Sequence, residues 1–168
     1  SGDAPAVLRP VYTPDAQGAL MPLAWKQLNA AQRTLFEGVD QAQGERRLEY
    51  LLGNRKDEVG QPGGFLRRRS GSLGAAPFGN LVYVGAPGLG MPGAGYGVHR
   101  KLLQERRKML YLGANDGLLH AFDARTGKEM FAYLPQALLG AAAGTASTHY
   151  SPGPLPDGAA ATAEVLAL

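Results

Sequence analysis

The sequence contains three histidines, His99, His120 and His149, the side chains best suited to move protons near neutral pH or to ligate a metal. No two of them stand four residues apart, as a metal-binding pair on one helical face does, and none belongs to an HExxH pattern. A GxSxG motif is also absent, and nothing in the spacing brings a serine beside a histidine and an aspartate. The sequence therefore predicts no catalytic residue, no cofactor-binding residue and no metal ligand.

Two pairs of carboxylates could also carry acid–base or metal chemistry. Asp57 and Glu58 are adjacent, but adjacent loop residues point in different directions, and no histidine or third carboxylate lies close to them. We therefore expect both to be solvated at the surface. Asp116 and Asp123 flank one short apolar run, and each lies in a turn where its side chain can accept hydrogen bonds from nearby backbone. We interpret both primarily as turn-forming residues.

The basic residues outnumber the acidic ones, giving a formal net charge of +3, and many of them fall into two groups. One group is Arg67, Arg68 and Arg69, and the other comprises Arg100, Lys101, Arg106, Arg107 and Lys108. Such groups can form a nucleic-acid-binding patch or can be solvated charge on loops and helices. Because no aromatic residues are interleaved to stack on bases, we favour the second interpretation and predict no nucleic-acid partner.

The elements that position these residues are clearest between Met109 and Tyr133. Three short runs rich in aliphatic and aromatic residues occur there: Met109–Gly113, Leu118–Asp123 and Glu129–Tyr133. The bends between them hold residues that tolerate positive φ or bond to nearby backbone, namely Asn115, Asp116, Gly117, Asp123, Thr126 and Gly127. The pattern predicts an antiparallel meander of three strands with this structural turn motif at its two bends.

The middle run of the meander is largely apolar on both faces. Leu118, His120 and Phe122 share one face, and the residues that alternate with them are mostly apolar as well. We therefore expect His120 to be a hydrogen-bonded imidazole in a core or an interface rather than a ligand. A small sheet that is covered on both faces needs neighbours, and stacked sheets of this kind are typical of a propeller.

Four strings in this region resemble the PilC/PilY family of type IV pilus tip-associated proteins. They are YLGANDG at Tyr111–Gly117, LHAFDA at Leu119–Ala124, TG at Thr126-Gly127 and AYLP at Ala132–Pro135. Weaker likeness continues upstream in Leu48–Arg55, Arg69-Ser70, Ser72–Gly74 and Val82–Pro87. The resemblance extends from about Arg9 to Val165 and is strongest in the middle.

The resemblance implies a mainly β fold, namely part of a quinoprotein-like β-propeller whose antiparallel blades carry short helical insertions. On this basis we expect residues 1–168 to be a fragment of that domain with about two blades. The helical insertion is expected at about 28–52 and the best-defined blade at 109–133. The family's aspartate-rich calcium loop has no counterpart in this sequence, so we expect no calcium ion or other cofactor in this segment.

By the same resemblance, the implied function is non-enzymatic: type IV pilus assembly, control of retraction, twitching motility, cell adhesion and virulence. The implied partners are pilins or minor pilins and a host-cell surface, bound through blade edges and the long loops at Asn54–Gly64 and Ala86–Gly97. The implied place is the cell surface or pilus tip, within the fimbrium of a Gram-negative bacterium. An incomplete propeller leaves strand edges unpaired, so we also expect self-association of the fragment.

A quinoprotein-like dehydrogenase fragment and a basic nucleic-acid-binding module remain as alternatives. Quinoprotein enzymes hold their cofactor with a vicinal disulfide or a similar platform and with tryptophan-rich repeats. This chain has no cysteine and one tryptophan. Since a shared fold does not transfer an activity, we expect no catalysis.

Two helices are predicted ahead of the meander, at about Leu28–Glu37 and Glu45–Leu52. Asn29 is the expected N-cap of the first helix, and Trp25 is expected to anchor that helix to the β-structure. The residues of the first helix that fall on one apolar stripe, and are therefore expected to face inward, are Leu28, Ala31, Leu35 and Phe36.

Two further strands are predicted before the meander. Val7–Thr13 has the composition of a strand, but Pro10 lacks a backbone donor, which favours either an edge strand or a kinked strand. Leu81–Gly85 is a short strand by the same criteria, and the Gly- and Pro-rich stretch Ala86–Gly97 is a loop.

The remaining predictions concern the segments on either side of the meander. Gly140–Ser147 is rich in small residues and is expected to be mobile, and Thr162–Leu168 is expected to begin another strand. Val98–Lys108 is predicted as an amphipathic helix or crossing segment with its apolar side inward, formed by Val98, Leu102 and Leu103.

The sequence shows neither the pattern of a membrane span nor that of an export signal. No stretch of about eighteen apolar residues occurs, so we predict no membrane span. The first residues lack a charged region followed by an apolar core, so we expect any signal peptide to lie outside this sequence.

Overall fold

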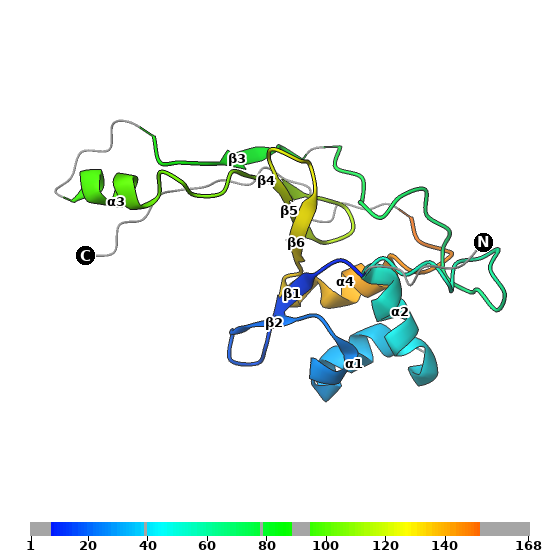
Figure 1. Cartoon of the computed structure of the whole chain (residues 1–168). Helices are drawn as coiled ribbons and strands as arrows, with labels where there is room; N and C mark the ends of the chain where they lie inside the picture. Colours follow the sequence, from blue (N-terminus) through cyan, green and yellow to red (C-terminus); the bar gives the residue numbers. More distant parts are fainter. Residues whose placement is uncertain (1–7, 39, 78, 89–94, 152–168) are drawn as a thin grey trace.

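The computed structural model of the chain describes residues 8–38, 40–77, 79–88 and 95–151. These residues contain one mixed six-stranded sheet in the order β2-β1-β6-β5-β4-β3 (Figure 1). Its outer strands are β2 (Leu20–Pro22) and β3 (Val82–Val84), so the sheet is open on both sides within the described residues. The prediction of a mainly β chain with helical insertions is confirmed. This open sheet does not by itself form a propeller.

The centre of the sheet is the predicted meander. It consists of β4 (Met109–Gly113), β5 (Leu119–Asp123) and β6 (Glu129–Tyr133), which pair antiparallel in sequence order. The prediction of three antiparallel strands is confirmed, with the middle strand beginning one residue later than expected. A β-bulge between Ala121 and Phe122 shifts the register between β5 and β6.

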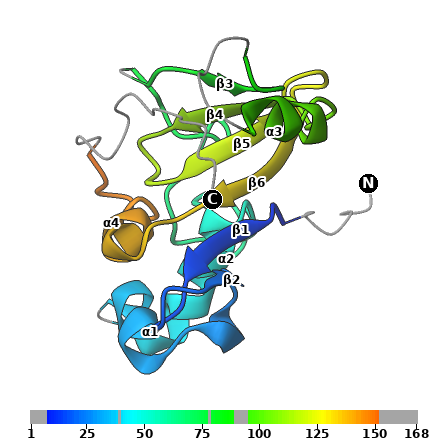
Figure 2. The same cartoon turned by 90° about the vertical axis from the view of Figure 1, so that its left-hand side faces the viewer.

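Strand β1 (Val11–Pro14) occupies an interior position, so the edge strand, one of the two predicted alternatives, was wrong. It pairs antiparallel with β2 and parallel with β6, as Figure 2 shows. Pro10 is tolerated because it stands just before the strand and contributes only its carbonyl, which accepts the Ala132 N–H at 2.9 Å. The first residue of the predicted run, Val7, lies outside the described residues.

Helix α1 (Ala30–Glu37) begins at the expected cap. Asn29 and Gln32 form a reciprocal capping box, in which each side chain accepts the other residue's backbone N–H at 2.9 and 3.0 Å. The predicted inward stripe was wrong in part, because Leu35 is 48% exposed while Gln32 is buried beside Phe36. Gln32 can be buried because its amide also donates to the Pro14 carbonyl, so its polar groups are used.

Helix α2 (Gly44–Leu51) follows a 3₁₀ turn, η2 (Gln41–Gln43), and buries Leu48 and Leu51 as predicted. Trp25, in the 3₁₀ turn η1 (Trp25–Gln27), packs against the same core, which confirms its expected role as an anchor. Leucines from the helices and apolar residues from β1, β6 and the β4–β5 turn meet in this core, whose buried members are Val11, Leu23, Leu28, Phe36, Leu48, Leu51, Leu52, Leu118, Ala132, Leu134, Leu139, Ala142 and Ala143.

The segment after β6 is ordered, and the prediction of a mobile Gly140–Ser147 was wrong. A 3₁₀ turn, η3 (Gln136–Leu138), leads into helix α4 (Leu139–Gly144). The small residues of α4 do not make it mobile, because they allow close packing: Ala142 is buried, and its methyl group lies next to Gly117.

Helix α3 (Tyr96–Leu102) lies at the opposite end of the molecule from the other helices (Figure 1). Its predicted apolar side does not face inward, because Val98 and Leu102 are 64% and 77% exposed and none of its residues is buried. The helix begins inside the predicted loop Ala86–Gly97, of which residues 89–94 lie outside the described part. The predicted strand Thr162–Leu168 lies outside it as well. Among the helices that the structure describes, none is long and apolar enough to cross a membrane.

Candidate site: a buried ion network and its cavity

The turn between β4 and β5 is formed by Asn115, Asp116 and Gly117. Gly117 adopts φ +84°, which a side chain would disfavour, and its N–H donates to the Ala114 carbonyl at 3.0 Å. The Asp116 carboxylate accepts the Leu118 N–H at 3.1 Å. This local bond fixes the Asp116 carboxylate at the entrance to β5.

The turn between β5 and β6 is built around Asp123. Its Oδ1 accepts the N–H groups of Arg125 and Thr126 at 3.0 Å each, and the Thr126 hydroxyl at 3.1 Å. Gly127 closes the turn at φ +70° and donates to the Asp123 carbonyl. The hydrogen bond from the Thr126 backbone is the main cause that lowers the pKa of Asp123. The Asp123 carboxylate therefore stabilises mainly its own turn, with Arg107 Nε 3.5 Å from its Oδ2.

Asp116, in contrast, belongs to a network centred on His120. The His120 side chain is fully buried, with Nε2 at 3.1 Å from both Asp116 carboxylate oxygens and Nδ1 at 2.6 Å from Glu129 Oε1. The Arg9 guanidinium lies 3.7 Å from both Asp116 and Glu129. A cation, two carboxylates and an imidazole are thus packed together. His120 is a hydrogen-bonded core imidazole, as predicted.

The network favours a charged His120. Burial works against the charge, but the hydrogen bonds to Asp116 and Glu129 outweigh it and raise the pKa of His120 above its ordinary value. Burial likewise opposes the charge of Asp116, yet the hydrogen bond from His120 and the charges of His120 and Arg9 lower the pKa of Asp116. Both shifts favour an imidazolium held between two carboxylates.

This pairing predicts that the protein loses stability as the pH rises. Because the folded pKa of His120 lies above the ordinary value of about 6.5, its stabilising contribution is complete below about pH 6.5 and is lost as pH rises through the folded pKa. Asp116 acts in the opposite sense: its contribution is present above about pH 3.9 and is lost as pH falls through its lowered pKa. Melting temperatures measured across this range should therefore decline on the alkaline side.

Two variants separate this effect from other titrations. His120→Gln should flatten the alkaline decline, because it removes the group whose proton is held more tightly in the folded state. His149→Gln, a matched change at an exposed histidine, should leave the decline in place. If the melting temperature of His120→Gln falls at alkaline pH as much as that of the unchanged protein, His120 is not the cause of the decline.

The network joins distant segments of the chain rather than presenting a reactive group. Arg9 donates to the carbonyls of Ser72 and Leu51 at 3.0 Å each, and the Gly74 N–H donates to Asp116 at 3.1 Å. His120 is sealed from solvent, and its two carboxylate partners bind opposite ring nitrogens, so they do not converge on one point. No group of three or more acidic, histidine or cysteine side chains within the described residues is arranged to hold a metal ion.

Gly74 is predicted to be intolerant of any side chain. A Cβ placed there would lie 2.6 Å from the Asp116 backbone nitrogen and 2.9 Å from Asp116 Cγ, so Gly74→Ala must displace the turn that holds the network. We expect it to lower the free energy of unfolding by about 1–3 kcal/mol, as overpacking does. Gly71→Ala is the matched control, because a Cβ at Gly71 meets nothing within 4 Å. Urea unfolding of both variants tests this, and equal losses would contradict it.

Asp57 and Glu58 are not solvated, and the prediction of surface carboxylates was wrong. Their side chains are only 10% and 4% exposed, respectively. Asp57 pairs with Arg46, while Glu58 lies between Arg55 and Arg69 at 2.9 and 3.0 Å. The arginines make burial tolerable by neutralising the charge. Burial opposes the charge of Glu58, but the hydrogen bonds from its two arginines keep its pKa below the ordinary value.

The basic cluster Arg67–Arg69 is likewise built into the structure, which corrects its interpretation as solvated charge. The Arg69 guanidinium stacks on the Tyr50 ring at 3.6 Å and donates to the Tyr50 carbonyl at 2.8 Å. Arg67 donates to the Thr145 carbonyl at 2.9 Å and lies over the Tyr150 ring. Arg68, between them, is exposed. The sequence signal that could have indicated this burial is Glu58, because it supplies the counter-charge for Arg69.

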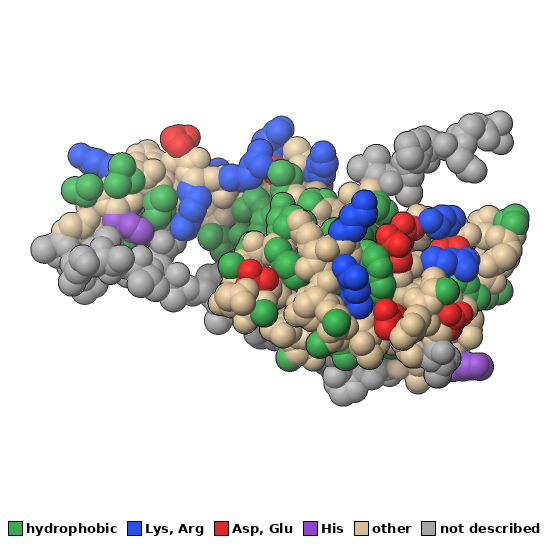
Figure 3. All heavy atoms as spheres, turned by 90° about the horizontal axis from the view of Figure 1, so that it is seen from below, with side chains coloured by type: hydrophobic (Ala, Val, Ile, Leu, Met, Phe, Trp, Pro, Cys, Tyr) green, Lys and Arg blue, Asp and Glu red, His purple; other side chains and the backbone are tan. Residues whose placement is uncertain are grey.

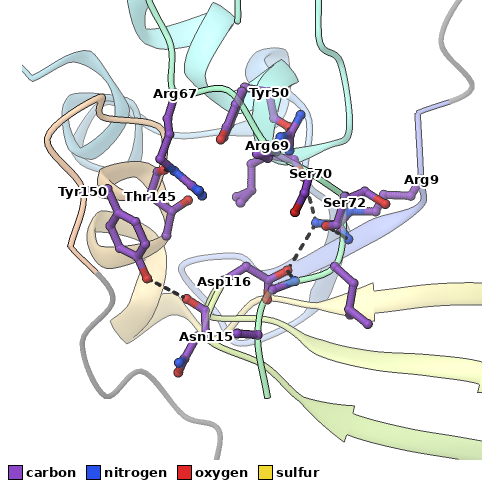
Figure 4. Close-up of a pocket in the computed structure, with 15 residues that line it drawn as sticks. Arg9, Tyr50, Arg67, Arg69, Ser70, Ser72, Asn115, Asp116, Thr145 and Tyr150 are labelled. Carbon is purple, nitrogen blue, oxygen red and sulfur yellow. Dashed lines mark hydrogen bonds and ion pairs between the residues drawn. The ribbon is translucent and has the colours of Figure 1, made fainter. Parts of the chain in front are cut away.

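A cavity of about 210 Å³ lies between these two ion networks (Figure 4). It is bounded by the end of α2, the segment 67–75, the β4–β5 turn and the end of α4. The Tyr150 hydroxyl closes one side by donating to the Asn115 carbonyl at 3.2 Å. Three arginines and one aspartate are among the lining residues, which are Arg9, Tyr50, Leu51, Arg67, Arg69, Ser70, Gly71, Ser72, Leu73, Gly74, Ala75, Asn115, Asp116, Thr145 and Tyr150.

Among known proteins, the chain is similar to curated type IV pilus biogenesis factors. No protein-family model matches the chain, and no solved structure matches it. The type IV pilus biogenesis factor PilY1 homolog of Xylella fastidiosa is 42% identical over 101 residues, covering 56% of this chain and 8% of that protein. The type IV pilus biogenesis factor PilY1 of Pseudomonas aeruginosa strain UCBPP-PA14 is 28% identical over 153 residues, covering 80% of this chain and 12% of that protein.

The similarity covers most of this chain but only a small part of each relative. PilY1 from Pseudomonas aeruginosa strain PAK is 29% identical over 133 residues, which cover 71% of this chain and 11% of that protein. The chain thus spans about a tenth of the length of the curated relatives that it matches. The resemblance found in the sequence motifs is confirmed: this chain is homologous to a segment of the type IV pilus biogenesis factors of the PilC/PilY family.

Proposed function

We propose that this chain is part of a type IV pilus biogenesis factor and acts by binding rather than by catalysis. The observation that carries the proposal is its similarity to proteins named type IV pilus biogenesis factor PilY1. The buried network agrees with a binding role, because its histidine and carboxylates hold the fold together and are withdrawn from solvent. The proposed location is the cell surface or the pilus tip of a Gram-negative bacterium.

We propose further that the sheet belongs to a β-propeller. Strands β3 to β6 form an antiparallel four-stranded unit, the size of one blade, and residues 1–168 would contribute about two blades. The sheet face turned away from the core carries Tyr12, Tyr111 and Phe131, whose rings contact edge to face at 6.4 Å. Hydrophobic side chains gather between the helical part and the α3 end, with basic side chains along their rim (Figure 3). Such a face suits stacking against a neighbouring blade.

The outer edge of β3 is the proposed surface for partners. Within the described residues β3 pairs only with β4. Tyr83 in the strand is 55% exposed, and Leu81 just before it is 56% exposed. A free strand edge flanked by exposed apolar side chains can accept an added strand. We propose pilins or minor pilins as the partners for pilus assembly and twitching, and a host-cell surface for adhesion and virulence. Self-association through the same edge stays a prediction.

The test is pilus assembly in a bacterium whose full-length protein carries Leu81→Lys with Tyr83→Lys. We expect fewer surface pili and reduced twitching at unchanged protein abundance, because charge at an edge opposes strand addition. The matched control carries Val98→Lys with Leu102→Lys, which places the same charges on apolar positions of α3 that are 64% and 77% exposed. Normal pili in the edge variant, or equal loss in both variants, would contradict the proposed surface.

A further inference from the structure

The cavity beside the ion network has the composition of a site for a negatively charged group. Arg9, Arg67 and Arg69 line it, against one acidic side chain, Asp116. Asp116 is already engaged by His120 and by backbone N–H groups, so its charge is largely compensated. Arg9 is paired with Asp116 and Glu129, and Arg69 is paired with Glu58, so the uncompensated positive charge on the cavity wall comes from Arg67.

Within the described residues, three buried polar atoms of the residues that line the cavity have no hydrogen-bond partner: two donors, the Tyr50 hydroxyl and Arg9 Nε, and one acceptor, Asn115 Oδ1. The Tyr50 hydroxyl and Arg9 Nε make no hydrogen bond to any described residue, although Tyr50 is only 2% exposed and the Arg9 side chain only 9%. Figure 4 shows the Tyr50 side chain directed into the cavity beside Arg67. Buried polar atoms are nearly always satisfied, so the two donors, the Tyr50 hydroxyl and Arg9 Nε, lack an acceptor oxygen that a group bound in the cavity would supply.

The state of Tyr50 makes it a donor. Burial raises the pKa of Tyr50, which outweighs the opposing effect of the nearby Arg69 and Arg67 charges, so the phenol keeps its proton near neutral pH. Its ring is fixed by the Arg69 guanidinium stacked on it at 3.6 Å. The hydroxyl is thus held in place as a neutral hydrogen-bond donor.

Arg67 adds a charged donor that still has unused capacity. Its Nε donates to the Thr145 carbonyl, while its two Nη atoms make no hydrogen bond to any residue in the described ranges. The guanidinium lies over the Tyr150 ring at 4.9 Å, which fixes its plane. A planar guanidinium with free N–H groups matches the two oxygens of a carboxylate.

We propose that this cavity binds a carboxylate group through Arg67, the Tyr50 hydroxyl and Arg9 Nε. A volume of about 210 Å³ is smaller than the sites that hold drug-sized molecules, so it suits one short acidic group. The carboxylate belongs either to a free small acid or to an acidic side chain or chain end of a bound peptide. The inference does not rest on the role in pilus biogenesis.

Titration of the full chain with glutarate, followed by calorimetry and by the NMR signals of the arginine side chains, tests the proposal. We expect saturable binding that glutaramide, the uncharged analogue, does not show. Arg67→Gln should weaken glutarate binding at least about tenfold, as loss of a charge-assisted hydrogen bond does. Arg68→Gln removes the same charge from the exposed neighbour outside the cavity, and should leave the affinity unchanged.

The Tyr50→Phe variant distinguishes a loss of glutarate binding from a loss of fold stability. It removes a hydroxyl that has no partner, so it should leave the melting temperature of the free chain unchanged or raise it, while weakening glutarate binding several-fold. A peptide whose sole carboxylate is its C-terminus, and an amidated peptide with one internal glutamate, distinguish a chain end from a side chain. Tighter binding of either peptide than of glutarate assigns the carboxylate to a protein partner.

Three results would overturn the inference. One is the absence of saturable glutarate and peptide binding up to about 10 mM, which is weaker than any useful affinity. Another is an equal loss of binding in Arg68→Gln and Arg67→Gln, which would indicate nonspecific charge attraction. The third is tighter binding of inorganic phosphate than of glutarate or either peptide, which would show that the site does not select a carboxylate.

Discussion

Replacing Asp116 with asparagine is expected to lower the free energy of unfolding by about 3–5 kcal/mol, the loss typical of breaking a buried ion pair. The side chain is 12% exposed, and its carboxylate is shared by His120 and two backbone N–H groups, with the Arg9 guanidinium 3.7 Å away. An amide in its place keeps the local turn bond but leaves the buried Arg9 and His120 with a single carboxylate, that of Glu129. Urea unfolding at neutral pH gives the free energy directly.

Asp123→Asn is the matched control for this change. Asp123 also lies in a turn of the same meander, but among the described residues its carboxylate contacts only its own turn and the exposed Arg107 side chain. An asparagine oxygen can accept the same backbone hydrogen bonds. Its loss should be far smaller than that of Asp116→Asn. Similar losses of unfolding free energy in the two variants would show that the ion network around His120 adds no stability beyond that of an ordinary turn.

Glu58→Gln is expected to have a comparably large effect, again about 3–5 kcal/mol of unfolding free energy. Glu58 is 4% exposed, and its carboxylate bonds to the guanidinium groups of Arg55 and Arg69. The Arg69 side chain is itself only 8% exposed, so the substitution leaves a buried cation without its counter-charge. Thermal and urea unfolding would measure the loss.

The exposed Glu45 provides the control for Glu58. Glu45→Gln makes the same chemical change in the first turn of α2, where the structure places the side chain in solvent. It should change the unfolding free energy by less than about 1 kcal/mol, as exposed charges do. If Glu58→Gln proves as mild as Glu45→Gln, the buried pairing with Arg69 does not stabilise the fold.

The meander and the helix cap could be predicted because their signals are local. Alternating apolar runs separated by Asn115-Asp116-Gly117 specify strands and a tight turn within a few residues. Asn29 followed by Gln32 specifies a helix start in the same way. The interior place of β1 could not be predicted, because its parallel partner β6 is at the other end of the described chain and no local pattern encodes that pairing.

In the candidate site, too, only the residues with local sequence signals could be predicted. The alternation of β5 placed His120 on a face with Leu118, so a buried, hydrogen-bonded imidazole was predictable. Arg9 and Gly74 were not, since both reach Asp116 from segments far away in the sequence. The burial of Glu58 was not predicted, because a loop of polar residues is normally solvated. The sequence does not show that Arg55 and Arg69 pair with this carboxylate.

The parallel pairing of β1 with β6 has a consequence for how the chain is completed during synthesis. Val11 and Ala132 are register partners, so the β1–β2 hairpin emerges long before the strand that receives it. Until β6 arrives, β1 has an unpaired edge, and the apolar core under it lacks Ala132 and Leu134. A nascent chain therefore passes through an interval in which chaperone binding is favoured, and slow folding steps between β2 and β6 lengthen that interval.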